Sequence, residues 1–451
     1  MKILRFSDFQ TSLPFSISAN NRDQYLSAFL STDLGKIYQA IPWQDLVKSF
    51  GLKPNKKGRR SIFSPKGKIG LMLLKHYACV SDKKLIDQLN ANIDYQIFCD
   101  IVITPDCRIQ NFKIVSEIRC ELSKLLDIAN VQQVLADAWR PYCENRNSMT
   151  CDATCYESYL RFPTDVKLLF ETVVWNYKQL KSICRQRKQR MPRSKYRKWI
   201  RRYKSYSKSR RPSRKSTRST LRGLLRLLRK IHEQLIVIEF EDTYHLPSTY
   251  IARRLTTAKI VEQQEQKFQD GEKIKNRIVS LDKPYIRPIV RGKEIKKVEF
   301  GAKVNKLQVD GISFIEHVSF DAFNEGTRWV DSIYLTQQLM KTQTRIVGAD
   351  KIYATNKNRT YATSHNIKTD FPRKGRPSKH KDHYDQLIAA ITKERATRLE
   401  GSFGTDKEHF LLNRVKARTK ETEILWIFFG IHTSNALKIG RRMSKSEQLA
   451  A

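Results

Sequence analysis

The stretch Arg345–Asp350, RIVGAD, is the part of the sequence that decides the fold class, because it is an apolar strand that ends in a carboxylate. Before it the sequence predicts further strands with alternating apolar and polar side chains, and a helix over Val330–Lys341. These strands cover residues 277–281, 285–290, 296–309 and 311–320, with Asp310-Gly311 as a primed hairpin turn. The order strand, hairpin, helix, strand predicts an α/β core flanked by helices.

Two helices are expected after this strand. They follow a polar, proline-containing loop over Lys368–His383, and their periodicity places them at Tyr384–Glu400, running on toward Phe410, and at Thr422–Arg441. A further buried strand is expected well before the hairpin, at Ser148–Tyr159 (SMTCDATCYESY), where small and β-prone residues surround Asp152.

The first 145 residues have a different, helical period. Apolar residues recur three or four apart, and Ser81 is placed to cap a helix that buries Leu85, Ile86 and Leu89. The predicted helices are Gln24–Leu30, Trp43–Phe50, Lys68–Val80, Ser81–Leu89, Cys107–Leu126 and Asn130–Trp139. Such a module on a basic chain is interpreted as a DNA-binding head, and a helical packing domain without specific contacts is the alternative.

Composition limits the class of protein. The chain has 451 residues, of which 40% are hydrophobic, enough for two or three domains, and 85 Lys plus Arg against 45 Asp plus Glu give a net charge of +40. An excess of this size indicates a polyanionic partner, and nucleic acid is the natural one. The longest apolar run, Ile424–Ile431, is too short for a membrane span, and Arg5 and Asp8 interrupt any signal peptide. We therefore expect a cytoplasmic, nucleoid-associated protein with no membrane partner.

Cysteine spacing does not predict a zinc site. All eight cysteines lie in the first half of the chain and none forms a C-x-x-C pair. We expect them to be reduced thiols that pack in the core.

A basic block interrupts the chain between the strand around Asp152 and the hairpin. Residues 176–230 contain 23 Lys or Arg and no Asp or Glu, with tyrosines and a tryptophan among them. This pattern suits phosphate neutralisation and stacking on DNA, and a solvated basic linker is the alternative. The expected DNA-contacting residues are Arg185, Arg187, Lys188, Arg197, Lys198, Arg201 and Arg202. The end of the block regains helical order, with an apolar face running from Leu221 to Leu235.

Three carboxylates occupy positions from which an acidic metal site can be built: Asp152 inside a strand, Asp350 at the end of a strand and Glu400 on a helix. A carboxylate is costly to bury in a strand, and a divalent cation with hard oxygen ligands is the compensation that would also explain the other two acids. Two Mg²⁺ or Mn²⁺ ions would then promote phosphoryl transfer on DNA. Surface charges brought together by chance are the alternative.

The sequence resembles the DDE transposases of bacterial insertion sequences, whose catalytic domain has an RNase H-like fold. The likeness is carried by DATCYESYLRFPTDVKLLFE (Asp152–Glu171), VGADKIYATNKNR (Val347–Arg359) and RLEGSFGTDKEHFLLNRVKAR (Arg398–Arg418). Residues 77–99, 299–311 and 436–443 also fit, so the resemblance covers most of the chain outside the basic block. It implies that Asp152, Asp350 and Glu400 are the catalytic triad and hold two metal ions.

Some positions depart from the pattern. In relatives with a Y-R-E-K signature, Tyr and Arg stand seven and four residues before the Glu, but here these positions are Lys393 and Ala396. Arg395 and Arg398 are the possible substitutes. Lys407 matches the signature lysine and would hold the phosphate beside the scissile bond. The acids Asp310, Glu316 and Asp321 near the hairpin are possible spare ligands, or ordinary turn and loop residues.

A second basic motif lies in the loop before the first of the two late helices. PRKGRPSK (Pro372–Lys379) contains the Gly-Arg-Pro core of an AT-hook, in which Arg373 and Arg376 would lie in a minor groove, and a chance basic loop is the alternative.

The sequence thus predicts an RNase H-like mixed sheet flanked by helices, preceded by an all-α N-terminal domain and interrupted by a basic helical insertion. The expected parts are a DNA-binding domain (1–145), the first strand segment of the catalytic domain (146–172), the insertion (173–275), the rest of the catalytic domain (276–441) and a tail (442–451). The predicted function is cleavage and joining of double-stranded DNA, at transposon ends and target, by a dimer assembled on DNA. A nuclease that cuts without joining and a catalytically silent DNA-binding protein are the alternatives.

Overall fold

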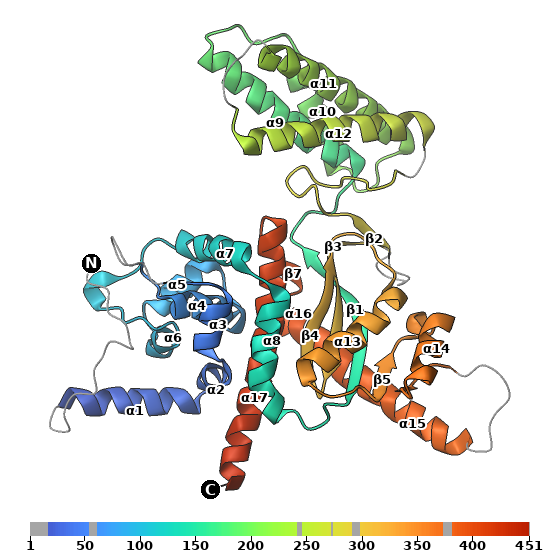
Figure 1. The fold of residues 1–451 in the computed structure, drawn as a ribbon. Coiled ribbons are helices and arrows are strands. Elements are labelled where there is room, and N and C mark those ends of the chain that lie inside the picture. Colours follow the sequence, from blue (N-terminus) through green and yellow to red (C-terminus); the bar gives the residue numbers. More distant parts are fainter. Residues whose placement is uncertain are drawn as a thin grey trace. The chain divides into compact units, whose positions relative to one another are not determined.

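The computed structural model describes residues 17–53, 61–240, 246–271, 274–290, 298–372 and 381–450. The chain forms two compact units (Figure 1). The first consists of Met1–Tyr159, Ala302–Ser319 and Phe323–Ala451, and the second of Leu160–Gly301 and Phe320–Ala322. None of the helices within the described ranges has the length and apolarity that crossing a bilayer requires.

The sheet is mixed. Its strand order is β2-β3-β1-β5-β6, with β4 paired to β3 and β7 to β1. Strand β3 is antiparallel to both β2 and β4, whereas β1 runs parallel to β5 and β7, and β5 parallel to β6. The strands are β1 (Ser148–Ser158), β2 (Pro288–Val290), β3 (Val298–Val309), β4 (Ile312–Ser319), β5 (Ile346–Ala349), β6 (Lys368–Thr369) and β7 (Arg414–Val415). The predicted α/β fold with a mixed sheet is confirmed.

The hairpin between β3 and β4 turns at the expected residues. Asp310 and Gly311 both have positive φ angles, 47° and 79°, as a primed two-residue turn requires. The strand predicted at 277–281 is wrong, because this segment has no strand pairing. Its apolar residues Ile278 and Leu281 are instead buried in the core of the second unit. Their alternation with polar residues therefore reflects burial and not hydrogen-bonded strand pairing.

Within the described residues, eight α-helices precede β1. They are α1 (Ile17–Ser31), α2 (Asp33–Ala40), α3 (Trp43–Ser49), α4 (Pro65–Ala78), α5 (Asp82–Leu89), α6 (Ile93–Phe98), α7 (Lys113–Leu125) and α8 (Ile128–Trp139). The Ser81 hydroxyl caps α5 by accepting a hydrogen bond from the Lys84 amide, and Leu85, Ile86 and Leu89 are buried as predicted. Helix α7 begins six residues later than expected, because Pro105–Cys107 forms a separate 3₁₀ turn.

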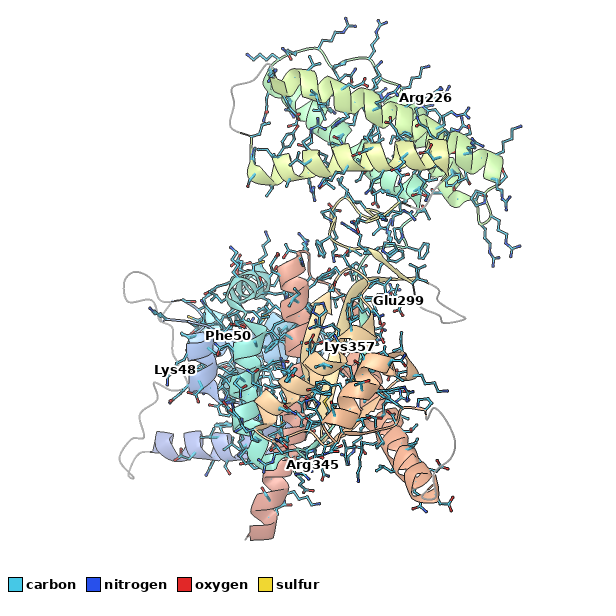
Figure 2. The ribbon with its side chains drawn as sticks, turned by 45° about the vertical axis from the view of Figure 1, so that its right-hand side comes forward. Lys48, Phe50, Arg226, Glu299, Arg345 and Lys357 are labelled. Atoms are coloured by element: carbon cyan, nitrogen blue, oxygen red, sulfur yellow. The ribbon has the colours of Figure 1, made fainter. Side chains whose placement is uncertain are left out.

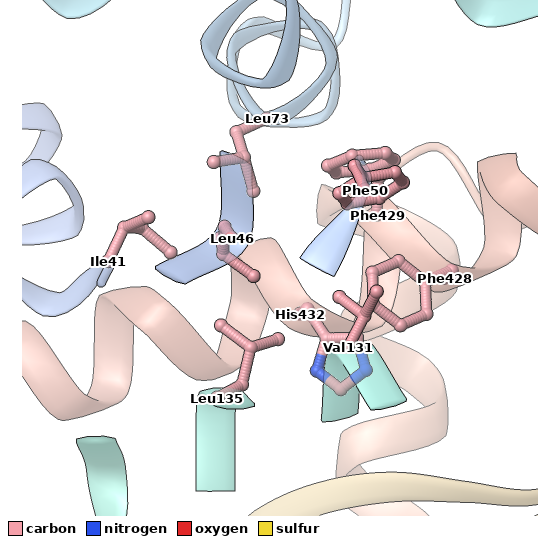
Figure 3. A pocket seen from close by; sticks show the side chains of 9 residues that line it. All are labelled: Ile41, Leu46, Phe50, Leu73, Val131, Leu135, Phe428, Phe429 and His432. Atoms are coloured by element: carbon pink, nitrogen blue, oxygen red, sulfur yellow. The ribbon is translucent and has the colours of Figure 1, made fainter. Parts of the chain in front are cut away.

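The first unit is held together by α17 (Lys420–Ala450), which packs against α2, α4, α7 and β4. The apolar run Ile424–Ile431 lies in this helix and is largely buried against the N-terminal helices. This burial accounts for its apolar composition. A small apolar pocket remains there, and Figure 3 shows its lining: Ile41, Leu46, Phe50, Leu73, Val131, Leu135, Phe428, Phe429 and His432. The imidazole of His432 is the polar group among these side chains.

The second unit is a helical bundle with its own core. Its helices are α9 (Asp165–Gln186), α10 (Tyr196–Lys208), α11 (Arg214–Phe240) and α12 (Ser248–Asp270). Leu224, Leu228 and Ile231 of α11 are fully buried, which confirms the predicted apolar face, and the basic side chains between them, such as Arg226, are exposed (Figure 2). Helix α10 has no buried residue, and it is attached to α9 by stacked rings, Tyr177 on Tyr196 and Phe170 on Tyr203, with centroids 3.6 Å apart.

Candidate active site

The register of two parallel strands brings Asp152 and Asp350 side by side. Cys151 of β1 pairs with Ala349 of β5, so the next residue along each strand is one of the two acids. Neighbouring strands are about 4.8 Å apart, which puts the two backbones within reach of one ligand. At the end of β5 the Asp350 carboxylate accepts a hydrogen bond from the Lys351 amide (2.7 Å) and so caps a 3₁₀ turn.

The carboxyl group of Asp152 is in an environment that disfavours its charge. Its pKa is raised to about 6, mainly by burial and in addition by the negative charges of Glu325 and Asp350. A hydrogen bond from the Ala153 amide (2.8 Å) and the positive charge of Arg395 act in the opposite direction. An added cation would therefore stabilise the carboxylate at this position.

Glu325 is an acid near this site that sequence reasoning missed. It begins the 3₁₀ turn before α13 (Trp329–Met340), and its side chain is ion-paired with Lys303 of β3 at 2.7 Å. It belongs to no motif that the sequence displays, so its proximity to Asp152 emerges only from the folded chain.

Tyr353 and Asn358, which follow Asp350 in the chain, hold the backbone in place by hydrogen bonds. The Tyr353 hydroxyl donates to Asn305 of β3 (2.8 Å), and the Asn358 amide donates to the carbonyls of Gly326 and Tyr353 (both 2.8 Å). Asn358 lies in α14 (Asn356–Ser364). These bonds fix the chain where β5 ends, and with it the position of Asp350.

Glu400 lies at the end of a π-helical turn. The predicted helix forms in three pieces: α15 (Lys381–Glu394), the π-helical turn Arg395–Glu400 and α16 (Gly401–His409). The Glu400 side chain is about half exposed (52%), and its Oε1 lies 3.4 Å from Nη1 of Arg395. The same guanidinium lies 3.5 Å from Asp370 through Nε.

The π-helical turn explains why an arginine five residues before Glu400 contacts it. A π-helix aligns residues i and i+5, whereas an α-helix aligns i and i+4, so the extra residue moves the contacting position from Ala396 to Arg395. Arg398, the other possible substitute, pairs with Asp310 (3.2 Å) and Glu394 (3.1 Å).

Lys407 of α16 reaches back to β1. Its Nζ donates to the Thr154 hydroxyl (3.2 Å), two residues beyond Asp152, and lies over the Tyr156 ring. The lysine is thus held on the strand that carries the first acid of the predicted triad.

The residues around Asp152 suit a hard divalent cation by chemistry, although the side chains as they stand are not gathered into a cage. Among the residues that the structure describes, no three Asp, Glu, His or Cys side chains are close enough to hold a metal ion together. Asp152 is a half-buried carboxylate beside other acids, and carboxylate oxygens are the ligands that Mg²⁺ prefers. The eight cysteines are free thiols.

The three acids near the hairpin are accounted for by ion pairs. Asp310 pairs with Arg398 and Arg442, Glu316 pairs with Arg328, and Asp321 lies 3.8 Å from Arg287. Their ordinary structural roles need no metal.

The basic residues predicted to contact DNA lie on the bundle of the second unit. Arg185, Lys188, Arg197, Lys198, Arg201 and Arg202 are exposed. Arg187 is half-buried and donates to the Ile238 carbonyl (3.0 Å), so it is engaged within the bundle. Arg373 and Arg376 lie outside the described residues.

Two regions of the chain match models of known protein families. Residues 347–431 match the family model of a transposase DDE domain, and residues 24–140 match that of a transposase domain (DUF772). Neither a curated protein nor a solved structure matches the chain. The first match covers β5, the π-helical turn and α16, and the second covers the N-terminal helices. The two matches in the same chain support an insertion-sequence DDE transposase.

Proposed function

We propose that this chain binds the terminal inverted repeats of its element, cuts the DNA strand at each end and joins the freed 3′-hydroxyl to target DNA. The observation that carries the proposal is the register of β1 and β5, which sets Asp152 and Asp350 next to each other on parallel strands. In this proposal Glu400 is the third ligand, and divalent metal ions bound by the three carboxylates would activate the attacking oxygen and stabilise the leaving oxygen.

The protein's own groups have separate roles in this proposal. Asp152, Asp350 and Glu400 are the ligands, two Mg²⁺ or Mn²⁺ ions per site being expected. Arg395, at 3.4 Å, holds the Glu400 carboxylate in place and balances its negative charge while no metal ion is bound. Lys407, held by Thr154 near Asp152, binds the phosphate beside the scissile bond.

DNA outside the active site is bound by other parts of the chain. The N-terminal helices recognise the terminal repeat, the exposed cations of the bundle bind phosphates, and Arg373 and Arg376 bind a minor groove. Two copies of the chain assemble on the paired ends, and the reaction takes place in the cytoplasm, on the nucleoid.

The experiment uses the full chain, a DNA end that carries the element's terminal repeat, and a supercoiled target. With Mg²⁺ the protein is expected to cut the end and to form a covalently joined product. Asp152→Asn, Asp350→Asn and Glu400→Gln should each lower cleavage by at least about 1,000-fold while binding in Ca²⁺ persists, because an amide cannot replace an anionic ligand.

The matched control is Glu408→Gln, which removes an exposed acid from the same helix and should leave cleavage unchanged. Near wild-type cleavage by any of the three amide variants would remove that residue from the site. Efficient cutting without joined product would favour the nuclease, and binding without cutting by the unaltered protein would favour the silent DNA-binding protein.

A further inference from the structure

A buried ion pair lies beneath the helix that carries Glu400. The ammonium of Lys306, on β3, is 2.7 Å from Oδ2 of Asp406, on α16, and the two side chains are 0% and 2% exposed. Burial lowers the pKa of Lys306, and the charge of Asp406 opposes that shift. A charged pair this deep is unusual, because removing two ions from water costs several kcal/mol each.

The pair is part of a hydrogen-bonded cluster that joins three elements. Lys306 also donates to the Ser402 hydroxyl (2.8 Å), which in turn donates to the Leu399 carbonyl (2.6 Å). The Tyr156 hydroxyl of β1 donates to the same Oδ2 of Asp406 (2.8 Å). The cluster therefore fastens α16 to both central strands of the sheet and contacts the last turn before Glu400.

The fastened face of the helix is opposite the face that carries Glu400. Ser402 and Asp406 are four residues apart and share one face, while Glu400 and Lys407, seven apart, share the other. Fixing the first face sets the rotation of the helix about its axis, and so the direction in which Glu400 points. This is needed here because the π-helical turn just before α16 has weaker, rarer geometry than an α-helix.

An apolar contact would hold the two elements together without fixing their orientation. Replacing a buried ion pair by apolar residues of similar size is often neutral or stabilising, so such a pair is poor evidence of a contribution to stability. The ion pair differs from an apolar contact in that its hydrogen bonds are directional. Three hydrogen bonds to two strands permit one rotation of α16.

We propose that Lys306 and Asp406, with Tyr156 and Ser402, are positioning residues that fix the rotation of the catalytic helix and with it the direction in which Glu400 points. The role of the helix rests on the proposed function, whereas its orientation by the cluster does not. Lys306 and Asp406 touch neither substrate nor metal in this proposal, and they act through Glu400.

The test replaces the pair by apolar residues in the full chain, as Lys306→Met/Asp406→Leu. We expect cooperative melting within a few degrees of the unaltered protein and unchanged DNA binding in Ca²⁺. Amide hydrogen exchange of residues 399–409 should become at least about tenfold faster, with β3 and β5 unchanged. Cleavage at saturating Mg²⁺ should fall by about 100-fold, the effect of misplacing a catalytic group by about 1 Å.

The control removes a different ion pair of the same unit, between Lys68 of α4 and Glu121 of α7 (2.6 Å), as Lys68→Met/Glu121→Leu. It should change neither the exchange of 399–409 nor cleavage. If the apolar replacement of the buried pair does not fold, Tyr156→Phe takes its place, because it removes one hydrogen bond and leaves no charge unpaired. It should speed exchange in α16 by a smaller factor.

Unchanged exchange of residues 399–409 in a folded variant overturns the proposal, whatever the cleavage rate. Faster exchange with undiminished cleavage overturns it as well, because the orientation of Glu400 would then not depend on the cluster. Failure of the unaltered protein to cut terminal-repeat DNA would contradict the proposed function alone, since exchange is measured without DNA or metal.

Discussion

Asp152 and His432 show how burial acts on single titratable residues of the first unit. Burial raises the pKa of Asp152 to about 6, so its carboxylate is less favoured than that of an exposed aspartate, and a bound cation would stabilise it. Burial lowers the pKa of His432 to about 3, and its partners also select the neutral ring. Nε2 lies 3.2 Å from the Gln132 carbonyl oxygen, an acceptor, and Nδ1 lies 3.2 Å from the Asn435 amide nitrogen, a donor.

The stability of the first unit should therefore decrease in acid. An unfolded histidine has a pKa of about 6.5, so between pH 6.5 and 3 the unfolded chain binds a proton that folded His432 does not. The free energy of unfolding then falls with decreasing pH by up to about 1.4 kcal/mol per pH unit for this residue. His76, whose pKa burial also lowers to about 3, adds an equal dependence.

Urea midpoints measured between pH 7 and pH 5 test this expectation. His432→Gln, which retains a donor for Gln132, should flatten the pH dependence by about one proton, and His76 should account for another. The exposed His365 provides the control, since His365→Gln should leave the dependence unchanged. A pH profile identical to that of the unaltered protein would show that His432 is not buried as a neutral ring.

At the scale of elements, the long helix α17 packs against both the N-terminal helices and the sheet. It approaches α2 closely at Gly440, where a Cβ atom would come within 2.2 Å of the Lys36 carbonyl oxygen. The obstacle is backbone and cannot rotate away. Only glycine permits the two helices to pack at this distance.

Gly440→Ala should consequently destabilise the packing of α2 on α17 by roughly 1–3 kcal/mol, the usual cost of overfilling a packed contact. The control is Gly404→Ala in α16, where nothing lies within 4 Å of the added Cβ. That variant should gain up to about 1 kcal/mol, because alanine is the better helix former. Urea midpoints that move in the same direction for both variants would contradict the close approach at Gly440.

At the scale of the whole molecule, the basic block is a folded bundle with its own core. Leu228 and Ile260 are fully buried in it. The Lys and Arg residues of the block therefore lie on the surface of a packed unit and not on a linker. Six of the seven cations singled out from the sequence point to solvent, a geometry that suits contact with a phosphate backbone.

Replacing these six exposed cations by Gln should flatten the dependence of log affinity on log salt concentration by up to about 5, at about 0.9 per phosphate contact. The variant carries Gln at Arg185, Lys188, Arg197, Lys198, Arg201 and Arg202. Binding measured between 50 and 200 mM salt, on terminal-repeat and random duplexes, should weaken by similar factors, because phosphate contacts carry no sequence information. An unchanged slope would place the DNA-contacting surface elsewhere, and a lost preference for the repeat would show that the bundle reads bases.

The sequence by itself determined the α/β class, the hairpin at Asp310-Gly311, the capped helix after Ser81 and the apolar face of α11. Each of these depends on residues close together in the chain, where side-chain periodicity and turn chemistry act directly. It also predicted Asp152, Asp350 and Glu400 as a triad, a prediction that the amide variants are designed to test.

Only the tertiary structure determined the contacts between residues that are far apart in the sequence. The apolar residues of 277–281 are buried in a core and the segment does not pair as a strand. An alternating pattern is compatible with either outcome, because both bury the apolar side chains. The π-helical turn exchanges Ala396 for Arg395 as the neighbour of Glu400, and no local pattern signals an extra residue in a helix. Glu325 near Asp152, and Lys306 on Asp406, are brought together across 173 and 100 positions of the chain, so packing alone sets these contacts.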